Sequence, residues 1–338
     1  MPLLLLVFSF VLNVAGVSIF RRLTAGNSRL LDIPNERSSH STPVTRGAGI
    51  AIVLTVLGLY SAIAGRDTDL SYVFAAGMIA VVSFLDDLFS VPLLIRLAVH
   101  FIAAGIFVYF SGSYLEISMP NSNLAAHFGS IAPWLTVLFV VWTINAFNFM
   151  DGIDGIAGAQ GIGAGAGWMV FGMVTGVTSY SMFGAILFGS CAGFLVFNWQ
   201  PARVFMGDVG STFLGFTFAV FPLITAPGRS EPPPEALAAT LVFLWLFLFD
   251  TIFTRLRLLA RFIPFWRPHR EHLYQRIVSR GASHRAAASY FGIVAIAAAC
   301  AFSFAGTTGM VPLILILSIS SVGLLVWARE KKIDVSSD

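Results

Sequence analysis

The chain is dominated by apolar runs whose length is close to the roughly 20 residues that an α-helix needs to cross a bilayer. These runs recur from the N-terminus to residue 328 and are separated by short polar connections. Of the 338 residues, 57% are hydrophobic and only 11% are charged, a balance that soluble domains do not have. We therefore predict an all-α, polytopic integral membrane protein in which residues 1–338 form a single transmembrane domain.

Judged by length, the apolar runs predict about eleven transmembrane helices. The predicted spans are residues 2–20, 48–65, 71–89, 92–111, 131–148, 156–174, 179–198, 211–227, 236–257, 287–305 and 309–328. The first run has no basic residue before its apolar stretch and two arginines, Arg21 and Arg22, after it. This order is the reverse of a secretory signal, so we expect a first span that is retained.

Basic residues fall on one side of the predicted membrane. The connections after even-numbered spans hold only Arg66 and Arg229. Those on the other side are Arg21, Arg22, Arg29, Arg37, Arg46, Arg203, Arg255, Arg257, Arg261, Arg267, Arg270, Arg276, Arg280, Arg285, Arg329, Lys331 and Lys332. Because cytoplasmic loops carry the excess of Lys and Arg, we expect the N-terminus outside and the C-terminus in the cytoplasm. Residues 21–47 and 258–286 are then cytoplasmic loops whose charge suits anionic headgroups or phosphorylated substrates.

Aspartates stand in or beside several predicted spans, where an ionisable group is costly and usually marks a site or a pathway. They are Asp86, Asp87, Asp151, Asp154, Asp208 and Asp250. In the predicted orientation, the first five lie at the cytoplasmic ends of spans three, five and seven, and the last lies in the cytoplasmic half of span nine. Scattered structural carboxylates would not all choose one side, so we predict one polar cluster at the cytoplasmic face.

The segment NAFNFMDGIDG, residues 145–155, supplies amide and carboxylate groups to this cluster. Three-residue spacing turns successive side chains by about 60° on an α-helix, so Asn145, Asn148 and Asp151 fan across one face. Their oxygens are hard ligands suited to Mg2+ or Mn2+. We expect Gly152 and Gly155 to loosen the helix beside the ligand.

Each acidic motif taken alone also has a purely structural explanation. Asp86 and Asp87 would serve as a solvated helix end, and the Asn/Asp stripe as a hydrogen-bonded seam between helices. Asp208 would serve as an N-cap before the span at 211–227. Their convergence on one side favours a functional site.

Two basic loops complete the predicted site. The first, residues 32–49, offers Arg37, His40 and Arg46 to phosphate oxygens. The second, residues 261–284, has arginines that the positive-inside rule alone would explain, but also two histidines beside a proline in RPHREH, which that rule does not explain. Neither loop has the Gly-rich spacing of a Walker motif or the His-Glu order of a metalloprotease, which argues against nucleotide hydrolysis and zinc proteolysis.

Taken in order, six motifs resemble those of the polyprenyl-phosphate N-acetylhexosamine-1-phosphate transferases. They are DIPNERSSHSTPVTRG, FLDDLFSVPLLIR, NAFNFMDGIDGIAG, FNWQPARVFMGDVGS, DTIFTRLRLLAR and HREHLYQRI, and they extend from residue 32 to about residue 285. The resemblance implies a Mg2+-dependent enzyme, with Mn2+ as a second candidate, that transfers a sugar 1-phosphate from a UDP-N-acetyl sugar to undecaprenyl phosphate and releases UMP. It also implies a multi-pass protein of the bacterial inner membrane whose active site faces the cytoplasm, with no nucleic-acid partner.

Within the family, the chain looks closest to the branch that starts O-antigen or other surface polysaccharides. The alternative is the phospho-N-acetylmuramoyl-pentapeptide transferase of peptidoglycan synthesis. The family's last cytoplasmic loop often carries HxHH, and here Tyr274 and Gln275 stand where histidines are usual. This departure leaves open the separate roles of His269 and His272 and the choice of sugar.

The resemblance also implies roles for individual residues. Asp208 and Asp87 are the expected metal ligands. The expected catalytic carboxylates are Asp86, Asp87, Asp151 and Asp154, with Asp86 as general base for the lipid phosphate. A covalent phosphoryl-aspartate route is the alternative to direct attack. The expected substrate-binding residues are Asn145, Asn148, Arg46, His269, Arg270 and His272.

An ion-coupled transporter is the alternative from another functional class, since it also combines many spans with intramembrane carboxylates. It predicts carboxylates near the bilayer midplane and, often, an internal repeat. The sequence instead places the carboxylates at one rim and contains no convincing repeat. A separate feature, the glycine run at 161–167, permits close helix packing, either within one bundle or in a homodimer.

Overall fold

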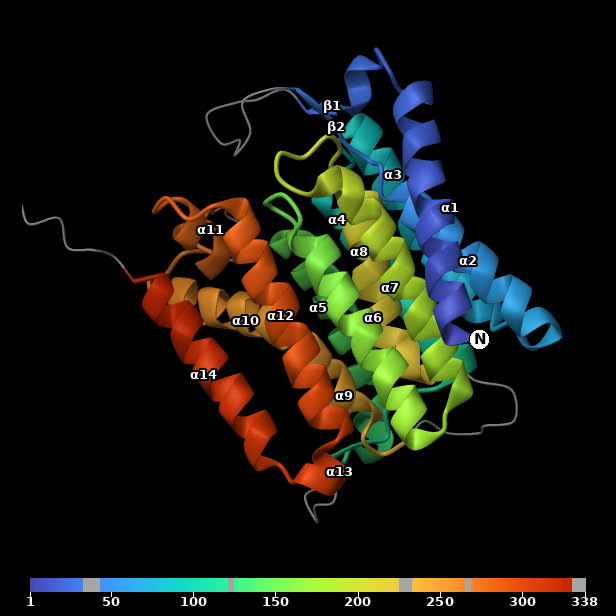
Figure 1. Ribbon diagram of the computed structural model, residues 1–338, viewed down its shortest axis with the longest axis vertical. Coiled ribbons are helices and arrows are strands. Elements are labelled where there is room, and N and C mark those ends of the chain that lie inside the picture. The colour runs from blue at the N-terminus through green and yellow to red at the C-terminus, as the bar shows by residue number, and fades with distance from the viewer. Residues whose placement is uncertain (33–42, 121–124, 225–232, 265–268, 330–338) are drawn as a thin grey trace, which may run out of the picture.

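The structure is a computed structural model, which describes residues 1–32, 43–120, 125–224, 233–264 and 269–329 (Figure 1). Its α-helices are α1 (Pro2–Leu23), α2 (Ile50–Ala64), α3 (Leu70–Phe89), α4 (Leu93–Ser111), α5 (Ala132–Met150), α6 (Ile156–Thr175), α7 (Thr178–Asn198), α8 (Gly207–Val220), α9 (Ala236–Phe243), α10 (Trp245–Leu259), α11 (Leu273–Val278), α12 (His284–Ser303), α13 (Ala305–Thr308) and α14 (Val311–Trp327). Its short 3-10 helices are η1 (Ser28–Leu30), η2 (Gly65–Asp67), η3 (Gly129–Ile131) and η4 (Phe221–Leu223). Its antiparallel strand pairs are β1 (Leu31–Asp32) with β2 (Val44–Thr45), and β3 (Glu116–Ser118) with β4 (Ala125–His127).

Within the described residues, every predicted span falls on one helix or on two successive helices, so the all-α membrane architecture is confirmed. Among the described residues, 7 helices are long and apolar enough to cross a membrane, or up to 8 if α9 and α10 count as one span. The remaining predicted spans are the Gly-rich α6, which is less apolar, and α8 and α14, which are shorter. The total of about eleven spans therefore stays a prediction.

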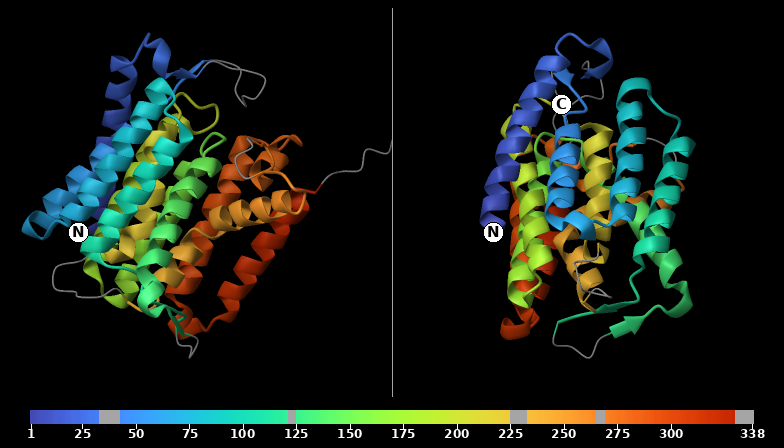
Figure 2. Two further views of the ribbon diagram at one scale, coloured as in Figure 1. Left: turned by 180° about the vertical axis from the view of Figure 1, so that it is seen from behind. Right: turned by 90° about the vertical axis from the view of Figure 1, so that its right-hand side faces the viewer.

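The chain connections gather at two ends of the helical bundle (Figures 1 and 2). One end, which we call the site end, carries β1, β2, the segment between α7 and α8, and α11. The opposite end carries β3, β4 and α13. At the site end, the Phe205 amide donates to the Thr45 carbonyl at 2.8 Å, so β2 is bound to the segment that leads into α8.

Glycines allow α6 to approach two neighbours closely. A Cβ atom at Gly165 would lie 2.6 Å from the amide nitrogen of Phe188 in α7, and one at Gly163 would lie 2.4 Å from the Cβ of Ala295 in α12. No larger residue fits at such distances. The glycine run is thus explained by packing within one chain, and a homodimer stays an expectation without support from these residues.

The predicted ninth span is broken. The axis turns by 75° between α9 and α10. The buried face of α10 carries Asp250, Thr251 and Thr254. Asp250 accepts hydrogen bonds from the backbone of α11, which lies at the site end, and these bonds tie α10 to α11.

Candidate active site

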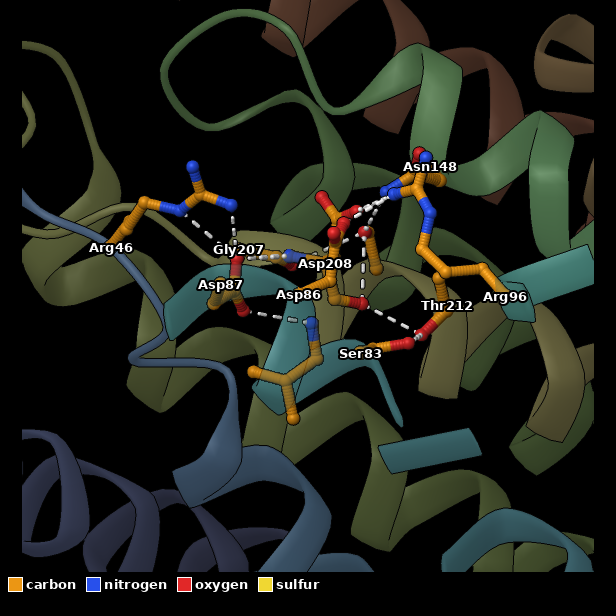
Figure 3. A network of polar contacts seen from close by, with 11 residues as sticks. Arg46, Ser83, Asp86, Asp87, Arg96, Asn148, Gly207, Asp208 and Thr212 are labelled. Carbon is orange, nitrogen blue, oxygen red and sulfur yellow. Dashed lines mark hydrogen bonds and ion pairs between the residues drawn. The ribbon is translucent and has the colours of Figure 1, made fainter. Parts of the chain in front are cut away.

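At the centre of the site, a side chain of α3 caps the first turn of α8, an arrangement that we call a trans-cap (Figure 3). Asp87, near the end of α3, accepts the backbone N–H of Asp208 on Oδ1 at 3.0 Å and that of Val209 on Oδ2 at 3.1 Å. These N–H groups open α8 and have no partner within the helix, and the helix dipole favours an anion there. Gly207 has a φ of 73°, and a Cβ atom at this position would lie 2.5 Å from Asp87 Oδ2. The glycine before Asp208 therefore permits the cap.

Two arginines pair with the three carboxylates of this centre (Figure 3). Arg46 donates from Nε at 3.0 Å and from Nη2 at 2.8 Å to Asp87 Oδ1. Arg96 donates from Nη1 to Asp208 Oδ2 at 2.7 Å and also to Asp86. The side chains of Arg46 and Arg96 keep 34% and 26% of their surface exposed. Each guanidinium thus neutralises buried acid while part of it stays accessible to an incoming anion.

Helix α5 brings the Asn/Asp segment to the same place. Asn148 donates from Nδ2 to Ser211 Oγ of α8 at 3.1 Å. α5 ends at Met150, and Asp151 is its C-cap, so Gly152 and Gly155 lie in the following turn and do not loosen the helix. Burial and the negative charges of Asp208, Asp87 and Asp154 raise the pKa of Asp151 well above its ordinary value. This turn therefore lies in a negative potential that a bound cation would relieve.

The side-chain oxygens of this centre can be compared with the ligands that a divalent cation needs. Among the residues described, no three His, Cys, Asp or Glu side chains are grouped as ready-made metal ligands. A hydrated Mg2+ commonly needs only one or two carboxylates, with water and substrate phosphate supplying the other oxygens. The Asp208 side chain is 23% exposed, whereas that of Asp87 is 0% exposed and has both oxygens bonded. Asp208 is therefore more accessible to a cation than Asp87, whose carboxylate caps α8, and the metal assignment stays a prediction.

The predicted histidine loop is built on Asp250. Its Oδ1 accepts from Leu273 N at 2.9 Å and contacts His272 Nδ1 at 3.1 Å, while its Oδ2 accepts from Tyr274 N at 3.1 Å. Because a carboxylate only accepts, the proton of His272 lies on Nδ1. His272 is 3% exposed, so its buried ring stabilises the loop through its contact with Asp250.

The other two predicted residues of this loop are more accessible. Arg270 is exposed, and His269 is half-buried with its ring centroid 5.2 Å from that of His272. Burial, and then the charge of Arg255, lowers the pKa of His269 to about 4. At neutral pH, His269 therefore offers a neutral ring, and Arg270 offers the positive charge.

Two predicted site residues bond elsewhere. Asn145 donates back to the Val141 carbonyl of its own helix at 2.7 Å. Asp154 is buried and accepts from Ala202 N at 3.1 Å, so it ties the turn after α5 to the segment that follows α7. Their substrate-binding and catalytic roles remain predictions. Arg37 and His40 lie outside the described residues.

Arg96 belongs to this centre, although the sequence analysis did not select it. It lies in α4, inside the predicted span 92–111. An arginine in an otherwise apolar span is as costly as an aspartate, so the criterion applied to the carboxylates would also have selected it. Its partners Asp86 and Asp208 are 10 and 112 residues away in sequence, and the pairing follows only from the packing of α3, α4 and α8.

Comparison with known proteins gives a consistent result. The sequence model of glycosyl transferase family 4 matches residues 70–226, a range that contains five of the six aspartates of the predicted cluster, with Asp250 beyond its end. Over 303 residues, the chain is 29% identical to the undecaprenyl-phosphate alpha-N-acetylglucosaminyl 1-phosphate transferase of Escherichia coli, which covers 83% of this chain and 77% of that protein. Over 258 residues, it is 27% identical to the probable undecaprenyl-phosphate N-acetylglucosaminyl 1-phosphate transferase of Bacillus subtilis, with 75% and 71% covered. Over 243 residues, it is 30% identical to the phospho-N-acetylmuramoyl-pentapeptide-transferase of Halalkalibacterium halodurans, with 66% and 74% covered.

Proposed function

Because the chain belongs to glycosyl transferase family 4, the polyprenyl-phosphate N-acetylhexosamine-1-phosphate transferases, we propose that it transfers an N-acetylhexosamine 1-phosphate from a UDP-sugar to undecaprenyl phosphate and releases UMP. The two N-acetylglucosaminyl transferases match 83% and 75% of the chain, against 66% for the pentapeptide transferase. This difference favours the start of O-antigen or another surface polysaccharide over peptidoglycan synthesis.

The observation that carries the proposal is the meeting of three carboxylates and two arginines at one end of the bundle. The reaction must bring two phosphorylated anions together. An oxygen of the lipid phosphate attacks the phosphorus that bears the sugar, a new P–O bond forms, and the bond to the bridging oxygen breaks, so that UMP leaves with the electron pair. Phosphoryl transfer depends mainly on positioning and on neutralising charge, which arginines at such a centre supply.

We assign the roles from the accessibility of each group. The exposed parts of Arg46 and Arg96 receive the phosphates. Asp86 is only 9% exposed, and we assign it from the family resemblance as the group that accepts a proton that the lipid phosphate still carries. Asp87 holds Asp208 in place through the α8 backbone. A hydrated Mg2+, or Mn2+ in its place, held by Asp208 and Asp151 would neutralise the diphosphate oxygens of the donor.

The second loop is the proposed binding site for the sugar-nucleotide. Arg270 supplies a charge for the diphosphate, and His269 supplies a neutral hydrogen-bonding ring for the sugar or phosphate. Asp86 and Asp87 lie in the last turn of α3, Asp151 caps the end of α5 and Asp208 lies in the first turn of α8. Carboxylates at helix ends, and not along the middle of the spans, favour an enzyme over an ion-coupled transporter. We place the site end at the cytoplasmic face of a bacterial inner membrane, where UDP-sugars are available.

The test is UMP release by the purified protein in detergent, with undecaprenyl phosphate and a panel of UDP-N-acetyl sugars, with Mg2+ present or chelated by EDTA. We expect release that requires both the lipid and Mg2+. Asp208→Asn should lose most of the activity, and Asp67→Asn, an exposed aspartate at the opposite end, should retain it. Absence of release with every donor would refute the proposed function, and unchanged Mg2+ dependence in Asp208→Asn would refute the metal assignment.

A further inference from the structure

The short helix α11 is fixed to the bundle at its first turn. Asp250 of α10 accepts the backbone N–H groups of Leu273 and Tyr274, and Thr254 Oγ1 donates to the same carboxylate at 3.0 Å. The Asp250 side chain is completely buried, so these bonds are not shared with water. The position of Tyr274 is therefore set by the backbone and not by a mobile loop.

Tyr274 reaches from α11 to the end of α5. Its ring is fully buried, and its hydroxyl donates to the Phe149 carbonyl at 3.0 Å. Phe149 belongs to the last turn of α5, whose carbonyls have no partner within the helix. The Tyr274 hydroxyl therefore caps α5 two residues before Asp151.

The same hydroxyl is in contact with the residue after Asp151. A Cβ atom at Gly152 would lie 2.0 Å from Tyr274 Oη, 3.1 Å from Cζ and 3.3 Å from Cε2. Gly152 does not have a positive φ, so a glycine is needed there for space and not for backbone conformation. Tyr274 thus touches the backbone on both sides of Asp151.

Tyr274 also contacts the histidine loop. Its ring stacks on that of His272, with centroids 5.9 Å apart and an interplanar angle of 22°. One buried side chain therefore joins the turn that carries Asp151 to the loop that carries His269 and His272. Because it is buried, Tyr274 cannot itself touch a substrate.

We propose that Tyr274 is a positioning residue: with Gly152 it forms a joint that holds the Asp151 turn and the histidine loop in one fixed arrangement for the transfer reaction. This inference rests on the proposed function. It assigns a role to a residue that stands where the resemblance would place a histidine, and it implies that residue 152 must be glycine while residue 274 is tyrosine.

The test uses the full-length protein with Tyr274→Phe, Gly152→Ala and the double variant, each assayed for UMP release with undecaprenyl phosphate and the UDP-sugar that the wild type accepts. A small displacement of a reacting group costs up to about a hundredfold in rate, so we expect Tyr274→Phe to lower kcat at least about tenfold and to raise the Mg2+ concentration for half-maximal rate. The KM for the donor should also rise, because the histidine loop loses the same contact. Gly152→Ala should be less active still. Adding Tyr274→Phe should restore part of its activity, because the nearest ring atom is then 3.1 Å from the new Cβ.

Tyr290→Phe is the matched control. The Tyr290 hydroxyl also donates to a backbone carbonyl, that of Ser320 in α14, at 2.6 Å, and a Cβ at the nearby Gly323 would lie 3.0 Å from it. We expect this variant to lower the melting temperature as Tyr274→Phe does while kcat is unchanged. An equal loss of kcat in both tyrosine variants would reduce Tyr274 to a general structural role and overturn the proposal.

Two further outcomes decide between the joint and the proposed function. A double variant no more active than Gly152→Ala, or a Tyr274→Phe variant with wild-type kcat and Mg2+ dependence, overturns the joint while the transferase assignment stands. If the wild type releases no UMP, the proposed function fails, and the joint is then read from the melting temperatures of the same variants. Non-additive shifts in these temperatures support contact between residues 152 and 274, and additive shifts refute it.

Discussion

Replacing Asp87 by Asn tests whether the trans-cap on α8 organises the site. The carboxylate accepts two bonds from Arg46, one from Asp208 N and one from Val209 N. Asn retains one oxygen but presents an N–H group to one of the donors, so at least one charge-assisted bond becomes a repulsive contact. Breaking a buried ion pair costs about 3–5 kcal/mol, and we take the lower end because Arg46 is 34% exposed and finds water instead.

A loss of about 3 kcal/mol is a large share of the roughly 5–15 kcal/mol that stabilises a folded protein, and should lower the melting temperature by several degrees. The same change frees the first turn of α8, which carries Asp208, so we expect kcat to fall about a hundredfold. Melting is measured by intrinsic fluorescence in detergent, and kcat by UMP release.

The control for this variant is Asp69→Asn. Asp69 also accepts two backbone N–H groups, from Ser71 at 3.0 Å and Tyr72 at 3.1 Å, but at the start of α3, at the end opposite the carboxylates. This variant should lose stability without a comparable loss of kcat. If Asp87→Asn instead had the melting temperature and the kcat of the wild type, the trans-cap would have no organising role and the reasoning would be refuted.

Three further predictions concern single side chains. Arg96 bonds Asp86 and Asp208 from one nitrogen, Nη1, and a lysine side chain is one atom shorter, so Arg96→Lys should weaken this bridge and lower UMP release about ten- to a hundredfold, and a wild-type rate would contradict this role. Burial lowers the pKa of His269 to about 4, whereas that of an unfolded histidine is near 6.5, so the unfolded state alone gains a proton between these values. Stability should therefore be retained above about pH 6.5 and lost as the pH falls toward 4, and melting curves of His269→Asn should show a flatter pH dependence in this window. Asp250→Asn removes an acceptor from the start of α11, so trypsin should cleave after the exposed Arg270 faster and KM for the donor should rise, and an unchanged cleavage rate would count against this anchoring.

Much of the candidate site could be predicted from the sequence. The acidic residues were selected because charge in an apolar environment is costly, and the structure brings Asp86, Asp87 and Asp208 together. Arg46 was also selected, and it bonds to Asp87. Asn145 was selected by its spacing, yet its amide bonds to its own helix. Spacing along a helix gives the direction of a side chain, but not whether a nearer backbone carbonyl takes its hydrogen bond.

The sequence by itself determined that this is an all-α membrane protein, where its helices lie and which end collects the arginines and aspartates, because hydropathy and charge are properties of each segment alone. Tertiary structure decided which groups meet. Arg96 joins Asp86 to Asp208, and Tyr274 fits over Gly152, only because helices distant in sequence pack at particular distances. Hydrogen bonds and close contacts depend on differences of less than an ångström, and no pattern along the chain encodes such differences.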